Sequence, residues 1–276
     1  MYRREVRVTD TTIDKLKIGT PLIMGKYGVN RDRPKPIIWL KGTPNGDFIT
    51  KDAIDYLPFD AKERENTENN NARIMGNSRY SVSNLLQFLN CAEESWFAPM
   101  HQFDAPPTVM NVDWNRGQYD QHYGFLYFFE EYEIAALEQD TRVVDTDNVA
   151  TLVRLPSIAD ILSSDRFKLF TKKGVRPKAT EELMGKPGAE FYLGSYVPFW
   201  VSDLGRNGYA TYIGRDGATK VQWPTVNCGV RPVCTINPAT AVVLGDDGFH
   251  YIKPQEIKQN VCTDEELYAF LGLAQP

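Results

Sequence analysis

The sequence predicts an α+β protein with a mixed sheet, few helices and long structured loops. Strand-like runs separated by turn residues follow one another from residue 190, and the pairs Asp216-Gly217 and Asp247-Gly248 indicate hairpins between them. Seventeen prolines and twenty glycines are spread along the chain without a low-complexity stretch, which indicates many turns rather than a helical bundle. The run Trp96–Thr108 combines aromatic residues, prolines and a histidine without helical or strand periodicity, so we expect a rigid, irregular loop there.

The first part of the chain predicts short strands joined by turns. Residues 5–8 have a strand-like pattern, and glycine and proline among the apolar residues of 17–27 predict a bent or bulged strand. Residues 43–47 have the composition of a turn, so 48–50 can return as the partner of a buried strand at 36–40.

Helices are expected at a few capped or periodic segments. Ser83 is a suitable N-cap for a helix over 84–89, and the best helical pattern in the chain is that of 125–139, where aromatic and alanine residues form one stripe. The almost wholly polar stretch 62–71 is expected to be an exposed loop. Capping boxes are recognised at 157–160 and 263–266, and further strands are expected at 149–155, 199–203, 209–213 and 228–234.

A single domain with short appended ends is the predicted organisation. No linker and no shift in composition divides the chain. We expect an N-terminal extension at 1–16, the domain at 17–250, and a C-terminal extension at 251–276 whose short helix needs a covering surface.

Charge and composition argue against several classes of partner. The formal net charge of −5 and the pI near 5.4 argue against nucleic acid as a main partner. No window approaches about 18 consecutive apolar residues, and the N-terminus has no apolar signal segment, so we expect no membrane insertion and synthesis in the host cytoplasm. Four cysteines without a C-x-x-C pair argue against a disulfide scaffold and structural zinc, so we predict no metal and no cofactor.

Several motifs follow one another in order: Phe88-Leu89-Asn90, Trp96–Thr108 with its Asp-Ala-Pro-Pro-Thr end, Tyr119-Asp120 before Gly124-Phe125-Leu126, and Gly229-Val230-Arg231-Pro232-Val233-Cys234. On these motifs, about residues 17–240 resemble an uncharacterised domain-of-unknown-function family of bacterial and phage proteins. The resemblance implies a fold of the C-type-lectin and formylglycine-generating-enzyme type. It also implies a phage setting, because members are often encoded among phage structural genes and many are suspected receptor-binding or virion-surface proteins. The run Phe199–Leu204 departs from the family, which usually has an arginine after its tryptophan.

Two pairs of residues are candidates for reactive groups. His101 and Asp104 could act as a base and its orienting carboxylate, but a turn held by Asp104 is the simpler interpretation because no activated nucleophile accompanies them. Cys228 and Cys234 could bind copper, as in an enzyme of the formylglycine-generating type. An extended strand would separate them by about 20 Å at roughly 3.3 Å per residue, so two buried small apolar residues are the simpler interpretation.

Acidic and aromatic side chains suggest two kinds of binding site. A calcium ion could be held by oxygen ligands, although scattered capping or solvated groups are the simpler interpretation of Asp113, Asn115, Asp120 and Glu130. Aromatic rings in rigid loops can stack on sugars or anchor a protein interface, although we expect core packing for at least half of them, with Trp39 and Trp200 buried. The candidate ligand-binding residues are Trp96, His101, Asp104, Trp114, Tyr119 and Trp223.

The expected function is that of a non-enzymatic bacteriophage virion structural protein, either a capsid decoration or a receptor-binding, tail-associated adhesin. Its expected partners are other virion proteins, reached through Met1–Lys17 and Thr263–Pro276, and a host cell-surface glycan or protein. We expect a homo-oligomer or a multi-copy assembly in the virion. The alternatives are an enzyme of the formylglycine-generating type, a hydrolase built on the loop Trp96–Thr108, which we call the central loop, and a bacterial carbohydrate-binding module.

Overall fold

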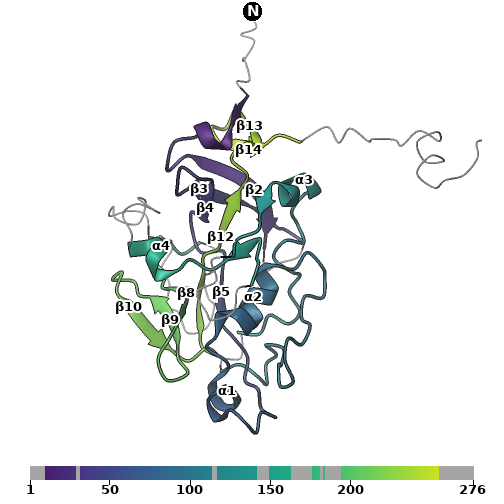
Figure 1. Cartoon of the computed structure of the whole chain (residues 1–276), viewed down its shortest axis with the longest axis vertical. Helices are drawn as coiled ribbons and strands as arrows, with labels where there is room; N and C mark the ends of the chain where they lie inside the picture. Colours follow the sequence, from purple (N-terminus) through teal and green to yellow (C-terminus); the bar gives the residue numbers. More distant parts are fainter. Residues whose placement is uncertain are drawn as a thin grey trace, which may run out of the picture.

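Two sheets form the frame of the structure, a computed structural model that describes residues 10–28, 32–113, 117–141, 149–162, 176–180, 183 and 194–254 (Figure 1). Within these residues the larger sheet has nine strands, in the order β1-β13-β14-β2-β3-β4-β12-β6, with β7 also paired to β12. The smaller sheet has five strands, in the order β10-β9-β8-β11-β5. The helices are few and short, so the sheet-rich mixed architecture expected from the sequence is confirmed.

The bounds of the elements are as follows. The larger sheet contains β1 (Thr11–Thr12), β2 (Pro21–Tyr27), β3 (Lys35–Lys41), β4 (Asp47–Thr50), β6 (Leu137–Glu138), β7 (Val153–Arg154), β12 (Val233–Ile236), β13 (Ala241–Leu244) and β14 (His250–Ile252). The smaller sheet contains β5 (Asp55–Pro58), β8 (Phe199–Leu204), β9 (Ala210–Ile213), β10 (Thr219–Gln222) and β11 (Asn227–Val230). The helices are α1 (Asn70–Met75), α2 (Asn84–Leu89), α3 (Glu131–Ala135) and α4 (Ile158–Leu162), with 3-10 turns η1 (Ile13–Lys15) and η2 (Tyr80–Val82).

The predicted bulge in the first long strand is confirmed. β2 pairs with β3 in antiparallel fashion, and the register shifts between Ile23 and Lys26. Gly25 lies in the shifted part with a φ of 65°, and a Cβ there would lie 2.3 Å from the ring of Phe129. Glycine is required because the left-handed backbone and the close aromatic ring both exclude a side chain.

The predicted hairpins are also confirmed. β3 and β4 pair across the turn 43–47, as do β13 and β14 across Asp247-Gly248. β9 and β10 pair on either side of Asp216-Gly217, but the connection is longer than the expected two residues because the N–H of Gly214 donates to the carbonyl of Ala218. The flanking strands therefore keep the predicted antiparallel pairing around a wider turn.

The single strand expected at 228–234 is wrong, because the chain changes sheet within it. β11 belongs to the smaller sheet and β12 to the larger one. Between them, the fully buried Arg231 donates from its guanidinium to the carbonyl oxygens of Thr50 (2.9 Å) and Lys51 (3.4 Å). Residues 51–54 also cross between the sheets, from β4 to β5, so the two crossings are bonded to each other.

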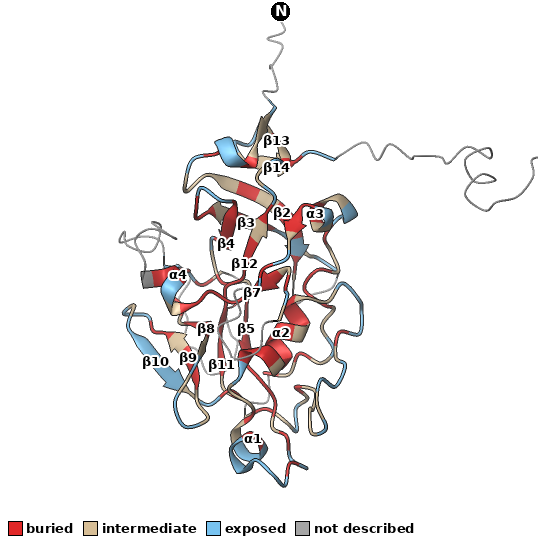
Figure 2. Cartoon of the chain, viewed as in Figure 1, coloured by how far each residue is buried: buried red, intermediate tan, exposed pale blue. Residues whose placement is uncertain are grey.

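Apolar side chains from both sheets and from α2 meet in one main core, where buried residues concentrate (Figure 2). Trp39 and Trp200 are fully buried, as expected. Each indole N–H donates to a backbone carbonyl, that of Met24 (2.9 Å) and that of Leu57 (2.8 Å) respectively. Buried tryptophans need such a partner for their single polar group.

The helix expected over 125–139 is wrong over most of its length. Turns occupy its first part, and within it only α3 is helical. The N–H groups of Phe125 and Leu126 donate to the carbonyl oxygens of Phe88 and Cys91, at 3.0 Å each. Phe125 and Phe129 of the aromatic stripe are buried, whereas Phe128 and Tyr132 are half-buried. The first two backbone N–H groups are thus bonded to residues at and after the end of α2 rather than within a helix of their own.

Short capping signals are confirmed where tertiary contacts do not compete. Ser83 Oγ accepts a hydrogen bond from the N–H of Leu86 (3.2 Å) at the start of α2. Ser157 and Asp160 bond reciprocally, side chain to backbone, at the start of α4. The strand expected over 149–155 is shorter than predicted, since only β7 forms within it.

The two ends of the described chain lie together. β1 pairs with β13, and the ammonium of Lys253 lies 2.6 Å from the carboxylate of Asp10. Ile13, within the predicted N-terminal extension, is fully buried in the main core. The predicted strand at 5–8 and the predicted helix after 263–266 lie outside the described residues. No helix within the described ranges is long and apolar enough to cross a membrane.

Candidate functional site: the distal loop surface

A buried stack of aromatic rings holds the central loop in place. The rings of Trp96 and Tyr119 are stacked, with centroids 5.1 Å apart and planes 8° from parallel, and both lie edge-on to Phe88 of α2. The indole N–H of Trp96 donates to the carbonyl of Tyr119 (3.1 Å). Their exposed fractions are 4% and 0%, so neither ring faces solvent. The exposure that ligand binding by these two candidate residues requires is therefore absent. Tight packing against α2 explains why the loop has a fixed shape without helix or strand.

Asp104 closes the turn that the sequence predicts. Its carboxylate accepts hydrogen bonds from the side-chain amides of Asn84 (3.2 Å) and Gln87 (2.9 Å), and from the N–H of Met100 (2.9 Å). The N–H of Asp104 donates to the carbonyl of His101 (3.2 Å). The carboxylate is thus engaged by α2 and by the loop backbone, which is the arrangement of the turn interpretation rather than of a base with its orienting carboxylate.

His101 instead faces a glutamate from another segment. Its Nε2 lies 3.4 Å from Oε1 of Glu63, whose side chain is only 2% exposed. Glu63 and Asn66 are both buried, and Asn69 caps α1 through its side chain. The exposed loop expected at 62–71 is confirmed for most of its residues. Glu63 and Asn66 are the exceptions, because their buried side chains bond each other and Glu63 faces the central loop.

A second buried carboxylate lies under the same loop. Asp60 accepts hydrogen bonds from the N–H groups of Asn77 (2.6 Å) and Asn84 (2.9 Å). Burial raises the pKa of Asp60 well above its usual range, against the lowering effect of these two bonds. The start of α2 is therefore bonded by two carboxyl groups, by Asp60 at the backbone N–H of Asn84 and by Asp104 at the side chains of Asn84 and Gln87.

Five large apolar side chains are exposed where these loops meet α1. We call them the distal surface: Ile74, Met100, Val109, Met110 and Trp223. The guanidinium of Arg64 donates to the carbonyl of Met110, and Pro224, which follows Trp223, lies against Gly76 at the end of α1. An open concavity of about 460 Å³ lies beside Ile74; it is lined by Lys62, Arg64, Glu65, Arg73 and Ile74. Trp114 lies outside the described residues.

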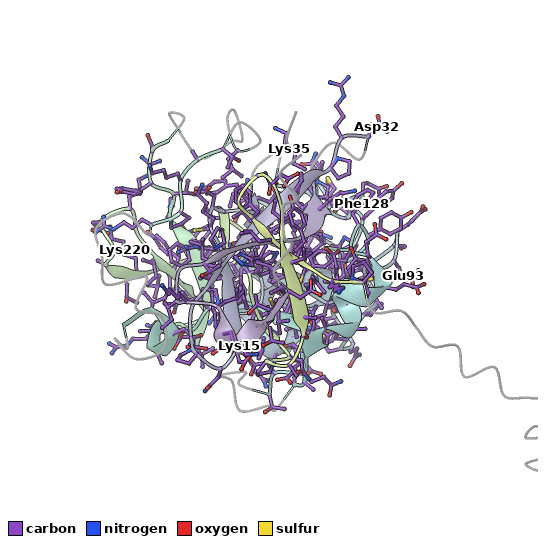
Figure 3. The ribbon with its side chains drawn as sticks, turned by 90° about the horizontal axis from the view of Figure 1, so that it is seen from above. Lys15, Asp32, Lys35, Glu93, Phe128 and Lys220 are labelled. Carbon is purple, nitrogen blue, oxygen red and sulfur yellow. The ribbon has the colours of Figure 1, made fainter. Side chains whose placement is uncertain are left out.

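The distal surface and the ends of the described chain are at opposite poles. α1 lies at the lower end of the long axis, whereas β13 and β14 lie at the upper end, beside the described N-terminal residues (Figure 1). Seen along that axis, charged side chains such as Lys35, Glu93 and Lys220 lie around the rim of the molecule (Figure 3). The distal surface, which includes Ile74 of α1, and the ends of the described chain therefore lie toward different ends of the long axis.

The candidate calcium ligands do not come together. Asp113 bonds Lys62 and Thr225, Glu130 caps α3, and Asp120 accepts a bond from the neighbouring Gln121 (2.9 Å). Asn115 lies outside the described residues. Across the described ranges, no three His, Cys, Asp or Glu side chains are arranged to hold a metal ion.

Cys228 and Cys234 are buried as the simpler interpretation predicts. Both thiols are free, with exposed fractions of 0% and 1%, and they lie on strands of different sheets. Burial raises the pKa of each thiol well above its usual range, so the nucleophilic thiolate is disfavoured.

Sequence reasoning missed two buried polar clusters. The hydroxyl of Tyr27 donates to Asp55 (2.5 Å) and lies 3.3 Å from Nδ1 of His122, which joins β2 and β5 to the turn segment that follows Tyr119. Arg154 bonds the carboxylates of Asp140 (2.7 Å) and Asp160 (2.6 Å) and is 1% exposed. The members of each cluster come from different segments of the chain, so no motif in the sequence indicates that they meet. Asp160 is recognised only as part of a capping box.

The chain was compared with known proteins at three levels, and no protein-family model, no curated protein and no solved structure matches it.

Proposed function

We propose that this chain is a non-enzymatic bacteriophage virion protein with a C-type-lectin-like fold, present in several copies. In this proposal it meets another macromolecule through its distal surface. The observation that carries the proposal is the two-ended arrangement of the molecule, with α1 and the distal surface toward one pole and the ends of the described chain at the other. The motifs of Trp96–Thr108 and 229–234, which resemble a family with many suspected virion proteins, support the phage setting.

The distal surface has the physical properties of a contact surface. Its five large apolar side chains are each more than 40% exposed, and exposed apolar surface is a feature of interaction sites. Met110 is 65% exposed, yet the backbone beneath it is held by Arg64 and by the bond from Lys62 N–H to the carbonyl of Asn111 (2.8 Å). A partner can therefore bind this loop without the loss of conformational entropy that ordering a mobile loop would cost. The proposed partner is a host cell-surface glycan or protein.

The opposite pole is suited to assembly. β1 and Lys253, which lie next to the two terminal segments in the sequence, meet at this pole. We place the contacts with capsid or tail subunits at this pole, through the terminal segments. Nucleic acid has no part in the proposal because the net charge is −5, and membrane insertion has none because no window of the sequence approaches about 18 consecutive apolar residues.

The enzymatic alternative gains no support from its candidate residues. A shared copper ion needs two nearby thiolates, whereas Cys228 and Cys234 are buried in different sheets with raised pKa values. A carbohydrate-binding module outside a virion would also adsorb to cells, but it would not be present in purified particles. The experiment below separates the two.

Paired substitutions at the two poles test the proposal. Met110→Asp places a charge on the distal surface, and Leu244→Asp places one at another exposed apolar position, on β13 at the opposite pole. We expect Met110→Asp to weaken adsorption of labelled protein to host cells by about fivefold or more, as loss of an interface residue worth over about 1 kcal/mol requires. Leu244→Asp should leave adsorption unchanged and lower the copy number in purified particles. Absence of the wild-type chain from particles, or substrate turnover by it, would reject the proposal.

A further inference from the structure

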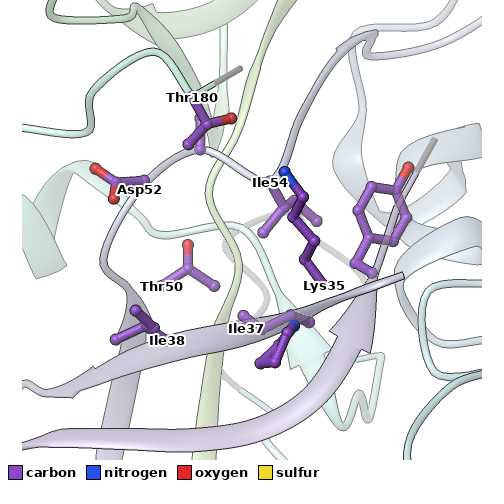
Figure 4. Close-up of a pocket in the computed structure, with 10 residues that line it drawn as sticks. Lys35, Ile37, Ile38, Thr50, Asp52, Ile54 and Thr180 are labelled. Carbon is purple, nitrogen blue, oxygen red and sulfur yellow. The ribbon is translucent and has the colours of Figure 1, made fainter. Parts of the chain in front are cut away.

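A small cleft lies at the seam between the two sheets, away from the distal surface. It is formed by the first half of β3, by residues 50–54 that cross from β4 to β5, and by Thr180 (Figure 4). Its volume is about 190 Å³, below the roughly 300–1,000 Å³ of sites for drug-sized ligands. The cleft is therefore of a size for one small ring.

Thr50 gives this cleft a polar group with no partner. Its side chain is 1% exposed, and its hydroxyl oxygen is buried and makes no hydrogen bond. Figure 4 shows this hydroxyl directed into the space between Asp52 and Ile54. A buried hydroxyl without a partner costs free energy that a threonine-to-valine replacement would recover. The unpartnered hydroxyl at this position points to a ligand that supplies the missing bond.

The rest of the lining combines polar groups with an aliphatic wall. Asp52 and Thr180 lie on the same side as Thr50, and Lys35 lies at the opposite side, next to Ile54 (Figure 4). One oxygen of Asp52 accepts a bond from the N–H of Lys178 (3.1 Å), which fixes its carboxylate at the rim. Ile37 and Ile38 of β3 complete the apolar part.

We propose that the cleft binds a neutral monosaccharide ring. Its charged lining residues, Lys35 and Asp52, have opposite signs, so the lining favours a ligand without net charge. A sugar hydroxyl can both donate and accept, which matches the hydroxyls of Thr50 and Thr180, the acceptor Asp52 and the donor Lys35. The carbon–hydrogen face of the ring would cover the isoleucine side chains. This site is separate from the distal surface, so either proposal can fail alone.

Two matched threonine-to-valine variants test the site. Thr50→Val removes the unpartnered hydroxyl without changing the shape of the side chain. Thr151→Val is the control, because the hydroxyl of Thr151 already donates to the carbonyl of Asp140 (3.3 Å). Ile38→Arg fills the cleft and provides a second, independent block. Binding is measured by saturation-transfer NMR and titration with glucose, galactose, mannose and N-acetylglucosamine, with leucine as a zwitterionic probe.

We expect at least one of the sugars to bind and leucine not to bind. Thr50→Val should weaken sugar binding by about fivefold to tenfold, as loss of one hydrogen bond implies, while the unfolding midpoint stays equal or rises. Ile38→Arg should abolish binding, and Thr151→Val should retain it with a lowered unfolding midpoint. The proposal is overturned by the absence of sugar binding, by binding of leucine alone, or by a loss of less than threefold in Thr50→Val.

Discussion

Trp96 is predicted to hold the central loop, and its removal measures that role directly. Trp96→Ala deletes a ring that is 4% exposed, stacked on Tyr119 and edge-on to Phe88. It also deletes the bond from the indole N–H to the carbonyl of Tyr119. Large aromatic-to-alanine changes in cores cost about 3–5 kcal/mol, so we expect a loss of that size in the free energy of unfolding.

Trp223 provides the matched control for this measurement. Its ring is 42% exposed on the distal surface, and surface substitutions typically change stability by less than about 0.5 kcal/mol. With a urea dependence of about 3 kcal/mol/M, Trp96→Ala should lower the unfolding midpoint by roughly 1–1.7 M, and Trp223→Ala should leave it nearly unchanged. Equal shifts in the two variants, or a shift of less than about 0.3 M for Trp96→Ala, would refute the anchoring role of the aromatic stack.

Three further predictions concern buried polar groups. Burial raises the pKa of Asp60 above its ordinary 3.8, so the folded state binds its proton more tightly, and the stability that this group contributes at low pH is lost as the pH rises from about 3.8 to its folded pKa. Asp60→Asn should remove that part of the pH slope of unfolding free energy, and an unchanged slope would contradict the burial argument. In a Cys91→Ser/Cys262→Ser variant, a thiol reagent should leave Cys228 and Cys234 unlabelled until the chain unfolds, because both are buried; rapid labelling of either in native protein would contradict their burial. Arg154→Leu should cost about 3–5 kcal/mol because it leaves two buried carboxylates without their cation, and a loss below about 1 kcal/mol in chemical denaturation would show that they find other partners.

Local signals in the sequence were sufficient wherever the neighbouring residues alone decide the structure. The helix after Ser83 and the hairpin at Asp247-Gly248 form as predicted, since a capping side chain and a glycine with positive φ act within a few residues. The bulge near Gly25 is also indicated locally, by glycine and proline within an apolar run. Its contact with the ring of Phe129 is not, because that residue is distant in the sequence.

The elements that differ are those decided by distant contacts. The apolar stripe of 125–139 fits a helix, but the bonds of Phe125 and Leu126 to the end of α2 replace the helical ones. The segment 228–234 reads as one strand, yet the chain changes sheet at Arg231, whose charge is satisfied by carbonyl oxygens from another segment. Neither partner is indicated by the local sequence.

The candidate site follows the same division. The turn interpretation of Asp104 could be made from its local sequence, and the structure supports it with three hydrogen bonds. The burial of Trp96 and Tyr119 could not be predicted from the local sequence, because each ring is covered by the other and by Phe88 of α2. Exposure of Trp223 agrees with its predicted place on a contact surface, although its ligand-binding role stays a prediction.

The orientation of the chain on a purified particle tests the central claim most directly. A cryo-electron microscopy reconstruction of particles that carry the protein would place both poles relative to the shell or tail. The account predicts that β1, β13 and β14 face a neighbouring subunit and that Met110 and Trp223 point outward into solvent. A map with the distal surface packed against the particle and the opposite pole outward would contradict it, as would particles that lack this chain.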